Sequence, residues 1–310
     1  MKFVTFEKAD KTIRSGWLDG DFVVDMYEVS DGKLPESLLE FLDNSEENMK
    51  MVMNLAPVTS EQKGRYPLSE IRLKAPLPMP RSFRDFYSFE QHVKTARENR
   101  GLEMIQEWYE IPVFYFSNHL AFKGPDDAIM KPNECEWLDY ELEIGCIIGK
   151  KGKNIRAEDA DHYIFGFCIL NDWSARDLQR KEMKVGLGPA KGKDFSTSIG
   201  PWIVTKEELE SLRYGKGYDL PMMARVNGTL LSNGNMKDLH YSFGEMIERA
   251  SVGVTLYPGE IIGSGTVGTG CILELGQKVH RWLLPGDQVE LEVEHLGILC
   301  NKITDGNEVK

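Results

Sequence analysis

The feature that most constrains the fold is a long succession of short strand-like runs separated by Gly and Pro turns. Segments with helical spacing are sparse among them, so regular β-α-β alternation is nearly absent. The pattern predicts a mixed α+β fold, predominantly β, with a mixed or antiparallel core. The expected strands lie at 112–117, 138–148, 163–170, 200–205, 221–227, 259–263, 271–275 and 287–294, and the expected helices at 157–162, 175–184, 206–212 and 241–250.

The N-terminal quarter differs from the rest of the chain. Residues 3–27 are typical of short strands joined by turns, and residues 36–55 have helical spacing. The stretch 75–80 then holds three prolines in six residues, which excludes helix and central strand. We therefore expect a domain boundary there, with a small N-terminal domain at 1–75 and a larger domain at 76–310 that begins with a helix near 86–100.

The net charge indicates which classes of partner are disfavoured, and the cysteine content indicates the redox compartment. The net charge of −12 works against nucleic acid or an anionic membrane as a partner, because both require clustered Lys and Arg. The five cysteines are widely spaced and form no CxxC, which argues against a disulfide framework or a zinc site. Without an apolar run of about 20 residues, we expect a soluble, cytoplasmic protein with no membrane partner.

The most informative segment is Trp137–Gly149, where acidic and apolar residues alternate. In a strand, Asp139, Glu141 and Glu143 share one face, and carboxylates two residues apart can hold one hard cation. The run 290–294 shows the same alternation of Glu with apolar residues. The pattern alone is therefore equally consistent with the solvated face of an amphipathic strand.

A second acidic position follows the apolar run 164–170. Asp172 lies where this strand meets a predicted helix start near Ser174, so it can be a metal ligand or a helix cap. Arg176 would face the same strand ends, with Gln179 one turn further along the helix. A capping Asp beside a surface Arg is the plainer interpretation of the spacing.

The run Gly263–Gly268 satisfies G-x-G-x-x-G, but a dinucleotide site also needs a long helix immediately after it. Gly270, Gly276 and Pro285 break such a helix, so we do not expect NAD. The loop more plausibly presents backbone N–H groups and Thr266 to a substrate carboxylate.

Five segments in order along the chain resemble motifs of the fumarylacetoacetate hydrolase family. The nine residues at 171–179, Asn-Asp-Trp-Ser-Ala-Arg-Asp-Leu-Gln, carry the most specific match. The five segments are 84–92, 139–143, 171–179, 188–197 and 265–274.

The resemblance implies a set of site residues. The metal ligands would be Asp85, Glu141, Glu143 and Asp172, and oxygen-only ligation suits Mg²⁺ or Mn²⁺, with Ca²⁺ possible. His92 would be the general base, and Glu274 the carboxylate that orients it. The oxyanion donors would be Arg176, Gln179 and Lys193. The substrate contacts would be Tyr87, Tyr115 and Thr266.

The resemblance also implies a mixed β-roll or barrel-like catalytic domain at 76–310, a small N-terminal β domain at 1–75, and a homodimer. Two positions depart from the family pattern. Met183 stands where the fumarylacetoacetate enzymes have Tyr, and the arginine expected after His92 has two candidates, Arg97 and Arg100. The end of the pocket that recognises the distal part of the substrate is therefore expected to differ.

The leading expectation is a metal-dependent hydrolase that cleaves a C–C bond in a β-diketo acid, such as an acylpyruvate or fumarylacetoacetate. The same metal site would also serve an oxaloacetate decarboxylase, a hydratase or dehydratase, or a keto–enol isomerase of a related small keto acid, because each stabilises an enolate. A non-catalytic dicarboxylate-binding protein is the remote alternative.

Overall fold

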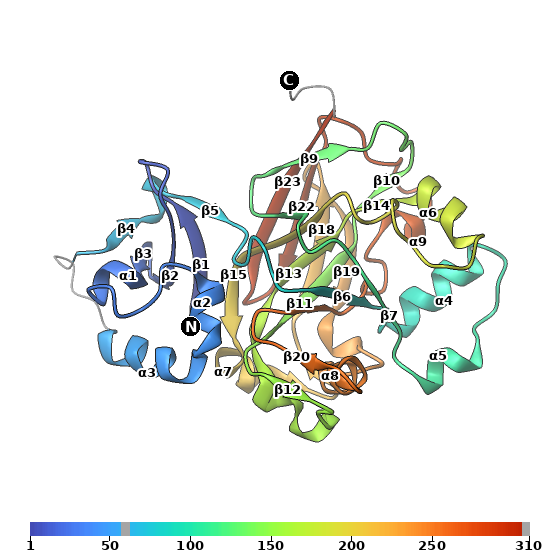
Figure 1. Cartoon of the computed structure of the whole chain (residues 1–310). Helices are drawn as coiled ribbons and strands as arrows, with labels where there is room; N and C mark the ends of the chain where they lie inside the picture. Colours follow the sequence, from blue (N-terminus) through green and yellow to red (C-terminus); the bar gives the residue numbers. More distant parts are fainter. Residues whose placement is uncertain (57–62, 306–310) are drawn as a thin grey trace.

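The computed structural model describes residues 1–56 and 63–305, and two β-sheets form its centre (Figure 1). Among these residues twelve strands build the larger sheet in the order β4-β3-β2-β1-β15-β13-β11-β21-β6-β7, with β5 paired to β1 and β8 to β15. Their bounds are β1 Lys2–Glu7, β2 Ile13–Asp19, β3 Phe22–Asp25, β4 Arg65–Pro67, β5 Arg72–Lys74, β6 Phe83–Phe86, β7 Phe114–Phe116, β8 Phe122–Lys123, β11 Leu142–Ile148, β13 Ile164–Asp172, β15 Thr197–Thr205 and β21 Ile261–Gly263.

The smaller sheet has five strands in the order β19-β18-β22-β23-β9, within the same described residues. Their bounds are β9 Ala128–Lys131, β18 Pro221–Val226, β19 Thr229–Asn235, β22 Gln288–Val293 and β23 Gly297–Asp305. Short two-stranded pairs complete the β structure. They are β10 Leu138–Asp139 with β14 Ser174–Ala175, β12 Gly152–Lys153 with β20 Thr255–Leu256, and β16 Arg213–Tyr214 with β17 Gly217–Tyr218.

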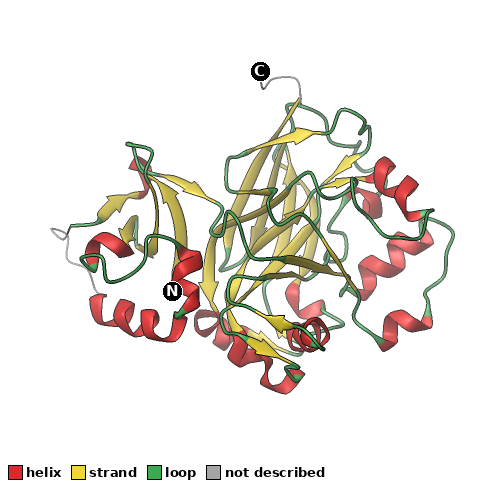
Figure 2. Cartoon of the chain, in the orientation of Figure 1, coloured by secondary structure: helices red, strands yellow, loops and turns green. Residues whose placement is uncertain are grey.

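The helices lie at the periphery of the strands, as Figure 2 shows. They are α1 Met26–Val29, α2 Leu38–Asp43, α3 Ser45–Leu55, α4 Glu90–Glu98, α5 Gln106–Glu110, α6 Arg176–Met183, α7 Lys206–Leu209, α8 Phe243–Ser251 and α9 Ile272–Leu275, with 3₁₀ turns at Leu68–Glu70, Ala157–Tyr163, Glu210–Leu212 and Met236–Asp238. Strand outweighs helix, which confirms the predicted mixed, mainly β class.

The N-terminal strands continue the larger sheet and do not form a separate one. Strand β1 pairs with β2 on one side and with β15 on the other, at Lys2↔Val204 and Phe3↔Ile203. The rings of Phe3 and Phe165 lie 5.3 Å apart across this junction. The boundary expected at residues 75–76 stays a prediction.

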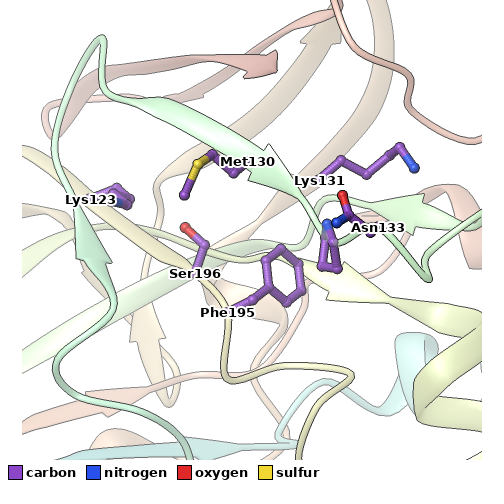
Figure 3. A pocket seen from close by; sticks show the side chains of 7 residues that line it. Lys123, Met130, Lys131, Asn133, Phe195 and Ser196 are labelled. Carbon is purple, nitrogen blue, oxygen red and sulfur yellow. The ribbon is translucent and has the colours of Figure 1, made fainter. Parts of the chain in front are cut away.

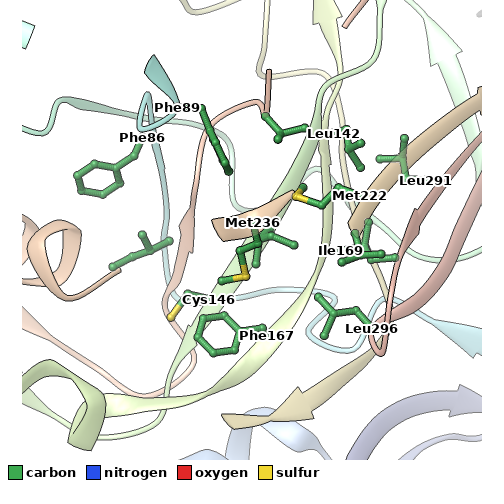
Figure 4. Close-up of a cluster of buried hydrophobic side chains, with 14 of the residues drawn as sticks. Phe86, Phe89, Leu142, Cys146, Phe167, Ile169, Met222, Met236, Leu291 and Leu296 are labelled. Carbon is green, nitrogen blue, oxygen red and sulfur yellow. The ribbon is translucent and has the colours of Figure 1, made fainter. Parts of the chain in front are cut away.

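An apolar core fills the space between the two sheets (Figure 4). Phe167 and Ile169 of β13 point from the larger sheet, and Met222 of β18 and Leu291 of β22 point from the smaller one, all with almost no exposed surface. This close packing holds β11 and β13 rigidly, and both strands lead to the candidate site.

Several expected elements differ from the structure. The helix expected at 157–162 is the 3₁₀ segment Ala157–Tyr163, and the helix expected near 86–100 is the shorter α4, Glu90–Glu98. The strand expected at 271–275 is the helical turn α9, because the Asp139 carboxylate accepts hydrogen bonds from the N–H groups of Ile272 (2.8 Å) and Leu273 (3.0 Å). The strand expected at 138–148 is interrupted at residues 140–141. The helix expected at 36–55 is divided into α2 and α3 at Asn44, whose φ of −131° is not helical.

Within the described part of the chain, no helix has both the length and the apolar character needed to cross a membrane.

Candidate active site

Four neighbouring strands of the larger sheet have one of their ends at the same side of the sheet, which is called the edge below. In the order β13, β11, β21 and β6, the first three run antiparallel and the last is parallel to β21. The C-terminal ends of β13, β21 and β6 therefore lie beside the N-terminal end of β11. This edge carries Asp172, Glu143, Gly263 and Asp85 in turn, with Glu141 directly before β11.

The structure brings the four predicted metal-binding acids together in a buried position. One oxygen each of Asp85, Glu141 and Glu143 lie within 4.8 Å of one another. Asp172 is outside this triplet, and Lys193 connects it to Glu141: Lys193 Nζ donates to Asp172 Oδ2 at 2.6 Å and also to Glu141 Oε2. All five side chains are buried.

The donor set fits a hard divalent cation. Asp85 Oδ1 and Glu143 Oε2 are buried and accept no hydrogen bond from the residues described, which is a costly arrangement without a cation. Gly263 leaves room for the Asp85 carboxylate at this position, because a Cβ on residue 263 would lie within 3.0 Å of Asp85 Oδ1. Oxygen-only donors suit Mg²⁺, Mn²⁺ or Ca²⁺.

Electrostatics in the site separate Glu141 from its neighbours. Burial, followed by repulsion from nearby carboxylates, holds the pKa values of Asp85 and Glu143 well above the usual range. Burial also opposes the charge of Glu141, but the Lys193 and Arg176 cations outweigh it and lower the pKa of Glu141. Glu141 is therefore the carboxylate whose ionised form the cations of the chain stabilise, and a bound metal ion would favour the ionised forms of Asp85 and Glu143.

Arg176 is held by carboxylates on two sides. Its Nε donates to Asp139 Oδ2 at 2.9 Å and its Nη2 to Glu141 Oε1 at 2.8 Å. Its Nη1 donates to Gln179 Oε1 at 3.1 Å, which leaves the amide N–H groups of Gln179 free to donate elsewhere. Helix α6, which begins at Arg176, thus presents two predicted oxyanion donors beside the metal ligands.

His92 on α4 and Glu274 on α9 form a buried dyad. His92 Nδ1 lies 2.5 Å from Glu274 Oε1, and Glu274 Oε2 accepts the N–H of Thr269 at 3.0 Å. If Nδ1 carries the proton in this hydrogen bond, Nε2 is left with a free lone pair. The dyad can therefore take a proton from a bound substrate or water.

The three predicted substrate-contact residues also lie at this site. Tyr115 Oη donates to Asp172 Oδ2, and Thr266 Oγ1 donates to Glu143 Oε1 at 3.2 Å, so both touch the acids directly. Tyr87 packs edge-on against the His92 ring at 5.3 Å, and burial raises the pKa of Tyr87 to about 12. Residues 264–271, which include most of the G-x-G-x-x-G run at 263–268, form a loop and not a long helix.

Sequence reasoning gave no role to two residues that support the site. Asp139 holds Arg176 and the start of α9, although its place in the acidic alternation suggested only a shared face with Glu141. Cys271 lies beside the dyad, with Sγ 3.8 Å from Glu274 Oε1. In the sequence, only its position three residues before the predicted Glu274 indicated that Cys271 could lie near the site.

The two candidate arginines after His92 differ in their contacts. Arg97 Nε donates to the backbone oxygen of Glu103 at 2.5 Å, on the exposed side of α4. Arg100 Nε donates to Ala96 O at 2.8 Å, and its charge acts on the pKa of Tyr87 against the effect of burial. Of the two, Arg100 therefore exerts a charge effect on a residue of the site, although its side chain is exposed.

Comparison with known proteins shows relatives that match over most of the chain. The family model described as "Fumarylacetoacetate (FAA) hydrolase C-terminal" matches residues 81–304. The chain is 32% identical over 280 residues to oxaloacetate tautomerase FAHD2B, mitochondrial, of Bos taurus, covering 87% of this chain and 80% of that protein. It is 29% identical over 315 residues to oxaloacetate tautomerase YisK of Bacillus subtilis (strain 168), covering 98% and 100%.

A solved structure extends the likeness to the whole fold. Fumarylacetoacetate hydrolase from Exiguobacterium antarcticum superposes with a TM-score of 0.75 at 28% identity, covering 98% of this chain and 99% of that one. The matched family segment contains all twelve predicted site residues, from Asp85 to Glu274. The chain therefore belongs to the fumarylacetoacetate hydrolase family.

Proposed function

We propose that this protein is a divalent-metal-dependent tautomerase that interconverts the keto and enol forms of a small dicarboxylic 2-keto acid such as oxaloacetate. The observation that carries the proposal is the joint presence of a buried dyad and two buried cations around one carboxylate cluster. Relatives named as oxaloacetate tautomerases match over most of their length, which favours this chemistry over the C–C hydrolysis expected first.

In the proposed reaction Asp85, Glu141, Glu143 and Asp172 hold the divalent cation. Mg²⁺ and Mn²⁺ are both suited to these donors, and the choice between them stays a prediction. When bound, the cation supplies Lewis-acid polarisation of the substrate's keto oxygen.

The chain's own residues move the proton. His92 Nε2 removes a proton from the carbon beside the keto group, and Glu274 stabilises the positive charge that His92 acquires. The electron pair of the broken C–H bond forms the new C=C bond, and the π pair of the C=O bond moves to the keto oxygen, near Lys193, Arg176 and Gln179, which supply N–H donors there. Protonated His92 returns this proton, directly or through a water molecule, to that oxygen, which completes the enol and restores neutral His92. The reverse reaction retraces these steps with no net gain or loss of atoms.

A dicarboxylic substrate needs a cation at its far end. Arg100 is suited to this role because its charge reaches Tyr87, whose ring packs on His92. The position held by Met183 is partly exposed and offers no hydroxyl there, unlike the Tyr of the fumarylacetoacetate enzymes. A short acid such as oxaloacetate is therefore a better candidate than a long diketo acid.

Hydrolysis of an acylpyruvate-like C–C bond is the second candidate. The same dyad can activate water, and the solved relative at 28% identity is named a hydrolase. Hydrolysis requires a water molecule between His92 and the substrate carbon, whereas tautomerisation requires direct contact.

The deciding experiment follows the ultraviolet absorbance of the oxaloacetate enol with Mg²⁺ or Mn²⁺, alongside an acylpyruvate and fumarylacetoacetate. We expect faster decay of the enol, abolished by chelator and by His92→Asn. Cleavage of a diketo acid with no effect on the enol would replace the tautomerase by the hydrolase. Failure of every substrate would favour the non-catalytic alternative.

A further inference from the structure

Lys193 reaches the acids from a short turn that follows an exposed loop. The loop offers little packing to hold the turn, since Val185 and Leu187 are 82% and 94% exposed. The turn is closed locally, because the N–H groups of Lys193 and Asp194 both donate to Ala190 O, at 3.0 and 2.9 Å. Something outside the loop must therefore fix where this turn sits.

Glu182, near the end of α6, holds the turn by its backbone. Its carboxylate accepts three consecutive N–H groups, from Ala190 (2.9 Å), Lys191 (2.7 Å) and Gly192 (3.1 Å). Burial opposes the charge of Glu182, but these three bonds outweigh it and lower its pKa. The contacts are therefore hydrogen bonds to an ionised acceptor, which are stronger than neutral ones.

The turn lies directly on the helix that carries the other two oxyanion donors. A Cβ on Gly192 would come within 2.8 Å of the backbone N and Cα of Gln179, so only glycine permits this approach. At the start of the helix, Ala175 N donates to Gly192 O at 2.8 Å. Glu182 and Ala175 thus attach the turn at both ends of α6.

The chain beyond Lys193 is anchored to the sheet and not to α6, because Thr197 pairs with Asp172 of β13 and its N–H donates to Ala121 O at 3.2 Å. Phe195 and Ser196 face a separate pocket with Met130, as Figure 3 shows, and Ser196 Oγ is buried without a partner among the described residues. Asn118 Nδ2 does donate to Asp194 O at 3.1 Å, but it comes from a loop and not from α6. The polar contacts that connect the Lys193 turn to helix α6, which carries Arg176 and Gln179, are therefore those of residues 190–192.

We propose that Glu182 is a positioning residue that sets the distance of Lys193 from Arg176 and Gln179, so that three donors converge on the developing negative charge. The inference rests on the proposed function, which gives Lys193 its role. Glu182 itself touches neither the acids nor the dyad, and it acts only through the turn.

The test is a double-mutant cycle of Glu182→Gln and Lys193→Met in the full chain, with Lys181→Gln on the same helix as the matched control. The measurements are kcat and KM for tautomerisation, Mn²⁺ affinity by calorimetry, and melting temperature. We expect Glu182→Gln to lower kcat about tenfold with little change in KM, as for other residues that orient a catalytic group. On the Lys193→Met background it should have no further effect. The control should match wild type.

Mn²⁺ affinity separates positioning from general damage. Lys193 competes for Glu141 and Asp172, so a displaced Lys193 leaves Mn²⁺ binding as tight as in wild type or tighter. Weaker Mn²⁺ binding in Glu182→Gln, additive losses of kcat in the double variant, or wild-type kcat in Glu182→Gln would each overturn the inference. Gly192→Ala, which pushes the same turn off Gln179, should behave like Glu182→Gln and provides a second route if that variant folds poorly. Full activity of Lys193→Met would instead refute the role of Lys193 in the proposed function.

Discussion

Replacing Gly263 by Ala should remove Asp85 from the metal site while leaving the sheet intact. The added Cβ would lie inside 3.0 Å of Asp85 Oδ1 and 3.1 Å from Asp85 Cγ. Because ordinary contact begins near 3.4 Å, the carboxylate oxygen must move by about 1 Å. Metal–ligand distances tolerate only about 0.2 Å, so Asp85 would no longer reach the cation.

The fold should tolerate this change, because the displaced atom is the end of a side chain and not backbone. Overpacking of this kind typically costs about 1–3 kcal/mol of stability. We expect at least a tenfold loss of Mn²⁺ affinity, measured by calorimetric titration of chelator-treated protein, together with a folded circular dichroism spectrum.

Gly145 offers a matched control, because it lies directly opposite Gly263 in the β11–β21 ladder. A Cβ on Gly145 meets Cys168 Sγ at 3.1 Å and touches no carboxylate, so Gly145→Ala should keep wild-type Mn²⁺ affinity. Wild-type affinity in a folded Gly263→Ala variant would refute the placement of Asp85 among the metal ligands.

Three further predictions concern the dyad, a second metal ligand and a charged group outside the site. Glu274→Gln should lower kcat about 100-fold without changing Mn²⁺ affinity, since it weakens the dyad and spares the acids; equal loss of both in the two assays would contradict this. Asp172→Asn should weaken Mn²⁺ binding at least tenfold in calorimetry while the melting curve stays cooperative. Asp287 is buried, yet Arg281 and the N–H of Leu284 outweigh burial and lower the pKa of Asp287 from 3.8 to about 2. The charge of Asp287 therefore contributes about 2 kcal/mol to the free energy of unfolding above pH 3.8. In urea unfolding, Asp287→Asn should be less stable than wild type at neutral pH. The difference in stability should disappear as the pH falls through 2.

The fold class followed from the sequence because turn residues and strand-like runs are local signals. Local signals failed where a distant side chain decides the outcome. The run 271–275 has the apolar residues of a strand, but the Asp139 carboxylate, more than 130 positions earlier, caps its first N–H groups and makes it helical. A single sequence does not reveal this contact.

The acidic alternation shows the same limit at the site. Glu290 and Glu292 repeat the pattern of Glu141 and Glu143, yet they lie on the outer face of the smaller sheet, paired with Arg225 and about one-third exposed. Glu141 and Glu143 are buried because their strand is covered on both sides and meets Asp85 from β6. Only the order of strands in the sheet separates these two cases, and before the structure only the family motifs favoured Glu141 and Glu143 as ligands.

The two parts of the site come from different kinds of structure, and this affects how the reaction can vary within the scaffold. The acids belong to the ends of adjacent strands, whose positions are fixed by backbone hydrogen bonds and by the core between the sheets. His92 comes from helix α4, Arg100 from the turn that follows this helix, and Lys193 from the turn held by Glu182, all of which lie outside the sheet. A change in either segment can move a proton-transfer or charge-stabilising group without disturbing the metal ligands. Differences in reaction among proteins of this fold are therefore expected to follow substitutions in α4 and in residues 182–193, and exchange of those segments between a tautomerase and a hydrolase should transfer activity while metal affinity stays the same.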